Sequence, residues 1–161
     1  MLPESDVQAT ISEIEAAFAG LAPPGDDNLL HPDSMDDVDI VDFYGEPTWD
    51  DLSDEAMIRS WAAHYFFSAQ AFQYYMPGFM IWSLRHSDTI DYTPESTIRA
   101  FDPGEPGDPL GEFRVTKFAL FTDAQIRSIV SFLRLFSQDD DLGDVAKGAL
   151  SNYWDARATP T

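Results

Sequence analysis

The stretch from Ser60 to Leu84 contains no Asp, Glu, Lys or Arg and is rich in aromatic residues. By length it could cross a bilayer, which requires about 20 apolar residues. However, polar residues interrupt it, as do Pro77 and Gly78, and its aromatic residues run throughout instead of gathering at the two ends. A helix that is apolar on several sides belongs in the centre of a helical protein. We therefore predict a buried aromatic core helix here and no membrane span.

Hydrophobic spacing on both sides of this stretch predicts further helices. Apolar residues recur at intervals of three and four from Val7 to Phe18, which indicates an amphipathic helix over 6–20 with a capping box at Ser5–Gln8. A second capping box, Thr122–Gln125, precedes another such stripe, and a final helix follows from Leu142 to Tyr153. A third stripe predicts a helix over 53–66 that buries Met57, Ile58, Trp61, Ala62, Tyr65 and Phe66.

The predicted fold class is all-α, an irregular bundle of about five or six helices around a central aromatic, Pro-kinked helix. Pro77 kinks or breaks that helix because proline lacks the N–H and its ring clashes with the Gln73 carbonyl. The 161 residues fit a single domain, 1–161. A short helix is expected at 94–100. The pattern over 113–121 fits either a helix or a strand, and we favour a helix. The remaining segments are an acidic loop at 22–47 with an extended piece at 38–41, a Pro/Gly loop at 102–111, and a frayed tail at 156–161.

The formal charge is −20, and it is concentrated at the front of the chain. Residues 1–60 contain 16 acidic residues and one base, Arg59, which gives this part a charge of −15. Such a field repels nucleic acids and anionic membranes and attracts basic proteins. A salt-adapted or high-GC source would produce the same bias with no partner involved, so both interpretations stand.

Motifs of known chemistry are absent from the sequence. There is no cysteine, which excludes disulfides, thiol nucleophiles and cysteine-ligated zinc. There is no Walker loop, nucleophile elbow or dinucleotide-binding glycine motif, and the Asp-rich loop lacks the EF-hand pattern. We therefore predict no catalytic residue, no metal site and no cofactor. The N-terminus lacks the features of a signal peptide, so a cytoplasmic location is expected.

Three segments resemble an uncharacterised family of small bacterial proteins. These are the W-D-D-L segment at 49–52, the A-F-x-Y-Y-L-P segment at 71–77, and a late T-x-x-Q helix start at 122–125. Met76 stands where the family usually has Leu, and Gly78 stands where a small side chain such as Ala is expected. The resemblance covers roughly residues 45–136. It implies a shared helical fold, and it carries no activity and no catalytic residue to this chain.

The segment Tyr74–Phe79 is the most unusual local feature. One interpretation is a helix break that lines a ligand groove, which we expect to include Tyr74, Tyr75, Pro77, His64 and His86. The other, which we favour, is an aromatic core helix bent to fit its neighbours. His86 and Asp88 could join His64 in a metal-hydrolase site only if the fold brings them together.

The sequence favours a non-enzymatic, acidic protein-binding domain. An immunity-type antagonist of a basic toxin or of a nucleic-acid-binding protein would fit, and no oligomeric state is indicated. The alternative is a small enzyme or ligand-binding protein that uses the Pro77 groove. The expected partner-binding residues are the front-end carboxylates Asp36, Asp37, Asp39, Asp42, Asp50 and Asp51.

Overall fold

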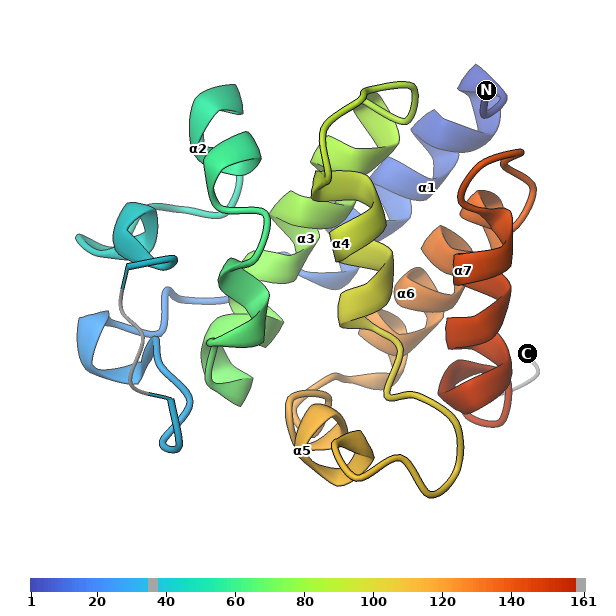
Figure 1. Cartoon of the computed structure of the whole chain (residues 1–161). Helices are drawn as coiled ribbons and strands as arrows, with labels where there is room; N and C mark the ends of the chain where they lie inside the picture. The colour runs from blue at the N-terminus through green and yellow to red at the C-terminus, as the bar shows by residue number, and fades with distance from the viewer. Residues whose placement is uncertain (35–37, 159–161) are drawn as a thin grey trace.

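The computed structural model describes residues 1–34 and 38–158, and this part of the chain is helical (Figure 1). The single isolated β-bridge among these residues joins Leu30 to Phe67. The prediction of an all-α fold is confirmed. The α-helices are α1 (Glu4–Ala17), α2 (Asp54–Arg59), α3 (Ala69–Arg85), α4 (Thr93–Ala100), α5 (Gly111–Thr116), α6 (Asp123–Phe136) and α7 (Gly143–Ala149).

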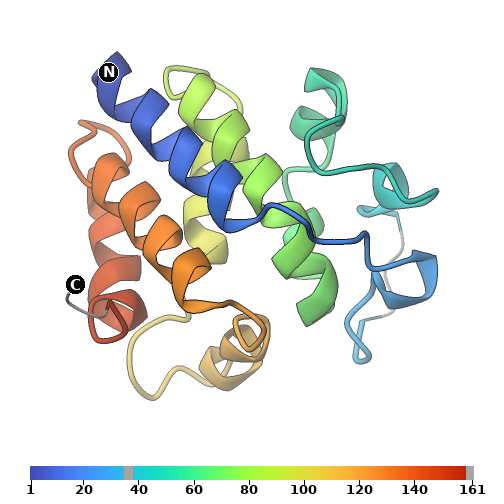
Figure 2. The same cartoon turned by 180° about the vertical axis from the view of Figure 1, so that it is seen from behind.

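Helix α3 is the centre of the bundle. It packs against α1 on one side and α4 on the other, while α6 packs against α1 and α7 (Figure 2). Most of α3 is buried, and its Phe72, Tyr75 and Phe79 rings pack against aromatic rings from several other elements. The segment 24–50 lies on the opposite side of α3 from α6 and α7 in both views (Figures 1 and 2). None of the described helices is long and apolar enough to cross a membrane.

Helix α3 continues through Pro77, so of the predicted kink or break the structure excludes the break. Proline removes one backbone donor, but residues 74–84 are all buried and their packing holds the helical path on both sides. Ser68 caps the helix, and its hydroxyl accepts a hydrogen bond from the Ala71 N–H. The aromatic residues of this stretch are core residues, as predicted.

The helix predicted over 53–66 is the largest error in the helix assignment. Helix α2 ends at Arg59, and a separate 3₁₀ turn covers Ala63–Tyr65. Of the stripe, Met57 is buried, whereas Ile58, Trp61 and Tyr65 are exposed. The reason lies in hydrogen bonds from distant segments, because the Ser96 hydroxyl bonds to the Trp61 carbonyl and the Lys117 ammonium bonds to the carbonyls of His64 and Tyr65.

Two features near the front of the chain also differ from expectation. Helix α1 begins after Pro3 without a side-chain cap, and Gln8 donates to the Glu4 carboxylate instead of closing a capping box. The piece 38–41 is a turn that leads into a 3₁₀ turn at Val41–Phe43, and it is not extended. Ile40 and Phe43 are buried there and anchor the acidic segment to the core.

The later loops follow the sequence more closely. Gly104 and Gly107 adopt positive φ within the Pro/Gly loop, and α5 begins at Gly111. Helix α7 continues into a π-helical turn, Leu150–Trp154. Of the predicted frayed tail, residues 156–157 form a turn and Ala158 packs against the core, while 159–161 lie outside the described residues.

The capping box at α6 is present and joins three helices. The Thr122 hydroxyl accepts from the Gln125 N–H, and the Gln125 amide oxygen accepts from the Thr122 N–H and from the Gln73 side chain of α3. The Gln125 amide nitrogen donates to the Ala17 carbonyl at the end of α1, 3.3 Å away. The predicted cap therefore also fixes how α1, α3 and α6 meet.

We expect Gln125→Ala to lower the free energy of unfolding by about 2 kcal/mol, because it removes the side-chain half of the capping box and leaves the partly buried Gln73 amide and Ala17 carbonyl without this hydrogen bond. Urea unfolding followed by circular dichroism measures this change. The matched control is Gln138→Ala, at an exposed position after α6, which should change stability by less than about 0.5 kcal/mol. Equal effects of the two substitutions would contradict this account.

Candidate protein-docking surface

Two exposed aromatic residues meet where α2 lies beside the start of α4. The Trp61 and Tyr92 rings have centroids 5.7 Å apart, and the residues are 42% and 67% exposed. Ile58 and the fully exposed Ile90 flank them in the sequence. We call Ile58, Trp61, Ile90 and Tyr92 the Trp61–Tyr92 surface. Large aromatic residues in such positions are the usual anchors of protein interfaces.

The backbone under this surface is fixed by one buried and one partly buried hydrogen bond from α4. The Thr93 hydroxyl donates to the Met57 carbonyl at 3.0 Å, and the Ser96 hydroxyl donates to the Trp61 carbonyl at 2.6 Å. Since Ser96 gives its only hydrogen to Trp61, the His64 Nε2, 2.6 Å from the Ser96 oxygen, must be the donor in that contact. The rings are thus held on a rigid base, which lowers the entropy cost of docking.

An acidic cleft of about 260 Å³ adjoins this surface and shares Ile90 and Tyr92 with it. None of the described residues that line it is basic. Arg99 reaches Glu95 from outside the lining, with the nitrogen and oxygen 2.9 Å apart. The cleft can accept a Lys or Arg side chain, with carboxylates for the cation and apolar groups for its stem. Its carboxylates are Asp88, Asp91, Glu95 and Asp141.

The cleft has the wrong arrangement for a metal. Within the described residues, no group of three or more His, Cys, Asp or Glu side chains is placed to hold a metal ion. The Thr89 hydroxyl also donates to the Asp91 carboxylate at 2.8 Å, which occupies one of the oxygens. A flexible organic cation therefore suits this cleft better than a coordinated ion does.

The carboxylates predicted to bind a partner differ in their exposure and in their internal hydrogen bonds. Asp42 accepts hydrogen bonds from Arg59 and Ser60, and the Arg59 guanidinium lowers its pKa. Asp50 and Asp51 are exposed, and Asp39 is half-buried. Asp36 and Asp37 lie outside the described residues.

The residues expected to line the Pro77 groove are held by internal contacts. The Tyr75 hydroxyl donates to the Pro47 carbonyl at 2.9 Å, and the Tyr74 hydroxyl bonds to the backbone of Trp49. Burial raises the pKa of both tyrosines. A Cβ at Gly78 would lie 2.5 Å from the Trp49 carbonyl oxygen, so the loop backbone covers this face of α3.

The two histidines predicted to line the Pro77 groove, His64 and His86, contact different residues. His64 is buried and bonds to Ser96 of α4. His86 stacks on the Trp82 ring at a centroid distance of 4.0 Å, and its Nδ1 lies 2.8 Å from the Trp82 carbonyl oxygen. Beside Gly78 there is a separate cleft of about 250 Å³, which Trp49 and Trp82 help to line.

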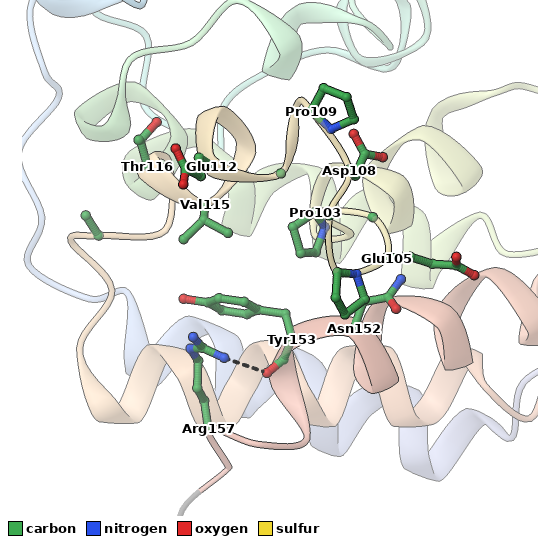
Figure 3. Close-up of a pocket in the computed structure, with 15 residues that line it drawn as sticks. Pro103, Glu105, Asp108, Pro109, Glu112, Val115, Thr116, Asn152, Tyr153 and Arg157 are labelled. Carbon is green, nitrogen blue, oxygen red and sulfur yellow. Dashed lines mark hydrogen bonds between the residues drawn. The ribbon is translucent and has the colours of Figure 1, made fainter.

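A larger open groove of about 800 Å³ lies between the Pro/Gly loop, α5 and the C-terminal turn (Figure 3). Tyr153 and Arg157 form its floor, with the guanidinium carbon 3.5 Å from the ring centroid. The Arg157 Nη1 also donates to the Tyr153 carbonyl at 3.1 Å. The sequence indicated a surface loop here but not the groove, because the groove forms only when the C-terminal turn lies opposite the loop.

Comparison with protein families gives one match, which covers nearly the whole chain. The sequence model of a family of unknown function, DUF6714, matches residues 8–158. The chain belongs to the DUF6714 family. Searches of curated proteins and of solved structures found no match. The DUF6714 match spans both the Trp61–Tyr92 surface and the acidic cleft, so the residues of both lie in the domain that defines the family.

The sequence pattern did not identify Trp61 and Tyr92 as surface residues. Trp61 fitted a helical stripe that the structure does not continue. Tyr92 and Ile90 lie among Ser, Asp and Thr between α3 and α4, and large apolar residues in such a polar connection are the signal that could have identified them.

Proposed function

We propose that this DUF6714 protein is a non-enzymatic binding domain that docks a basic protein partner on the Trp61–Tyr92 surface and the adjoining acidic cleft. The observation that carries the proposal is the exposed Trp61–Tyr92 pair beside a cleft with four carboxylates and no lining base. Aromatic anchors supply most of the affinity of such interfaces, and charge complementarity speeds association.

The front-end charge supports the same proposal at longer range. A charge of −15 in residues 1–60 creates a field that draws a cationic protein toward the domain. Asp50 and Asp51 are exposed and contribute to this field. Asp42 contributes less, because Arg59 already pairs with it. The role that we favour for this chain is that of an immunity-type antagonist, and the partner class is a basic toxin or a basic nucleic-acid-binding protein.

The proposal is tested with two double variants and their matched controls. Trp61→Ala with Tyr92→Ala removes the aromatic anchors, and Asp88→Asn with Asp141→Asn removes half of the cleft carboxylates. The controls change exposed residues elsewhere by the same chemistry. They are Tyr44→Ala with Leu120→Ala, and Asp123→Asn with Glu112→Gln.

We expect a basic protein captured at low salt from the source lysate, then purified, to bind the wild-type domain in titration calorimetry. The aromatic double variant should weaken this binding at least tenfold, and the carboxylate double variant should slow association and reduce its salt dependence. The controls should stay within about threefold of wild type. If variant and control pairs weaken binding equally, or if no basic protein binds, the proposal fails.

A further inference from the structure

Lys117 is buried in a manner unusual for a lysine. It follows α5, is 5% exposed, and its ammonium donates to the carbonyls of His64 at 2.8 Å and Tyr65 at 2.6 Å. Within the described residues, no carboxylate lies within ion-pair distance of this ammonium. An ammonium has three N–H donors, so the two carbonyls leave one donor without a hydrogen-bond acceptor among the described residues, and the Phe113 ring lies on the same ammonium with its centroid 5.2 Å from Nζ. A buried cation without a counter-ion is a costly arrangement that an anion would relieve.

Lys117 lines a cavity of about 170 Å³ that differs from the rest of this acidic chain. The other cations on its wall are Arg99 and Arg114, and none of the described lining residues is Asp or Glu. Arg99 pairs with Glu95 and Arg114 pairs with Asp108, so Lys117 is the cation that lacks an acidic partner. Most of the remaining wall is apolar and includes Phe72, Leu110 and Phe113.

We propose that this cavity binds a small organic carboxylate, whose carboxylate group pairs with the Lys117 ammonium and whose apolar body packs against Phe72 and Phe113. The volume equals that of about five to six water molecules, which suits an acid of the size of butyrate or benzoate. This site is independent of the Trp61–Tyr92 surface, so neither proposal depends on the other.

The electrostatics of the cavity determine how binding can be measured. Burial lowers the pKa of Lys117 to about 8. The other titratable or charged residues that line the cavity are the neutral His64, Tyr65, Arg99 and Arg114. A bound carboxylate favours the charged ammonium and therefore raises the pKa of Lys117.

The chain has only two lysines, which makes the experiment specific. Protein labelled with ¹³C-lysine should give two Cε signals, and the exposed Lys147 on α7 serves as the internal control. We expect benzoate and butyrate to shift the Lys117 signal saturably and to raise its pKa by at least one unit, while Lys147 does not change. The neutral isosteres benzamide and butyramide should produce neither effect.

Variants separate binding from folding. Lys117→Met should weaken benzoate binding at least tenfold, and Lys147→Met should change it less than twofold. Because Lys117→Met could impair folding, Leu110→Trp provides a second test, since it fills the cavity mouth and keeps the ammonium. This variant should abolish binding and leave both lysine signals dispersed. The proposal is overturned if benzoate leaves the Lys117 signal unmoved, if benzamide moves it equally, or if inorganic phosphate binds as well as benzoate.

Discussion

Replacing Gly78 with Ala should lower the free energy of unfolding by about 1–3 kcal/mol, although alanine favours helices. Gly78 lies inside α3, and an added Cβ would meet the Trp49 carbonyl oxygen at 2.5 Å and the carbonyl carbon at 3.4 Å. The Trp49 backbone cannot retreat freely, because the hydroxyls of Tyr74 and Tyr75 hold the segment 47–49 on this face. Urea unfolding followed by tryptophan fluorescence measures the change.

The matched control is Gly148→Ala in α7. A Cβ there would meet Asp102 at an ordinary contact distance of 3.6 Å. This substitution should therefore stabilise the protein by about 0.5–1 kcal/mol, which is the intrinsic preference of alanine over glycine in helices. If the two variants shift stability in the same direction, the close approach of α3 and the Trp49 backbone is not the reason that position 78 requires glycine.

This contact also explains how two parts of the family resemblance are related. The W-D-D-L segment at 49–52 and the Tyr–Tyr–x–Pro segment of α3 lie against each other, with glycine allowing their close approach. The sequence showed the two segments separately. It could not show their contact, because the pairing joins residues that lie about 30 positions apart in the chain.

Local patterns predicted what depends on local interactions. The stripe of α1, the apolar character of α3 and the capping box at Thr122 depend on neighbours within one or two turns, and all three are present. The helix prediction over 53–66 was wrong because this region depends on distant residues. Its carbonyl groups bond to Ser96 and Lys117, which are 35 to 53 residues away, and no periodicity signals such partners.

The candidate docking surface was beyond prediction for the same reason. Its aromatic pair joins the end of α2 to the start of α4, and its cleft joins the segment 87–95 to Asp141 and Leu142. The excess of acidic residues was visible in the sequence, but the sequence did not show which carboxylates form internal ion pairs and hydrogen bonds. Asp42 was predicted to bind a partner, but in the structure its carboxylate accepts hydrogen bonds from Arg59 and Ser60.

The stability of the protein should fall between pH 7 and pH 5 through the titration of His64. Burial, with a smaller contribution from the Lys117 charge, lowers the pKa of His64 to about 3. The unfolded chain takes up a proton near pH 6.5, whereas the folded chain does not until about pH 3. The unfolded state therefore binds more protons in this window, and the free energy of unfolding decreases as the pH falls. Integrated from pH 7 to pH 5 the loss is about 2 kcal/mol, since the slope approaches about 1.4 kcal/mol per pH unit only below the unfolded pKa.

His64→Gln isolates this contribution, because its amide can still donate to Ser96 but does not titrate. Urea unfolding at pH 7 and pH 5 should show a loss in the wild-type protein that exceeds the loss in His64→Gln by about 2 kcal/mol. His86→Gln, which changes the half-buried histidine stacked on Trp82, should keep the wild-type loss. The ring signals of the histidines in NMR give an independent measurement, in which His64 should not titrate above pH 4. A His64 that titrates near pH 6.5 would show that its ring is solvated, and the hydrogen bonds that hold Trp61 through Ser96 would then need another explanation.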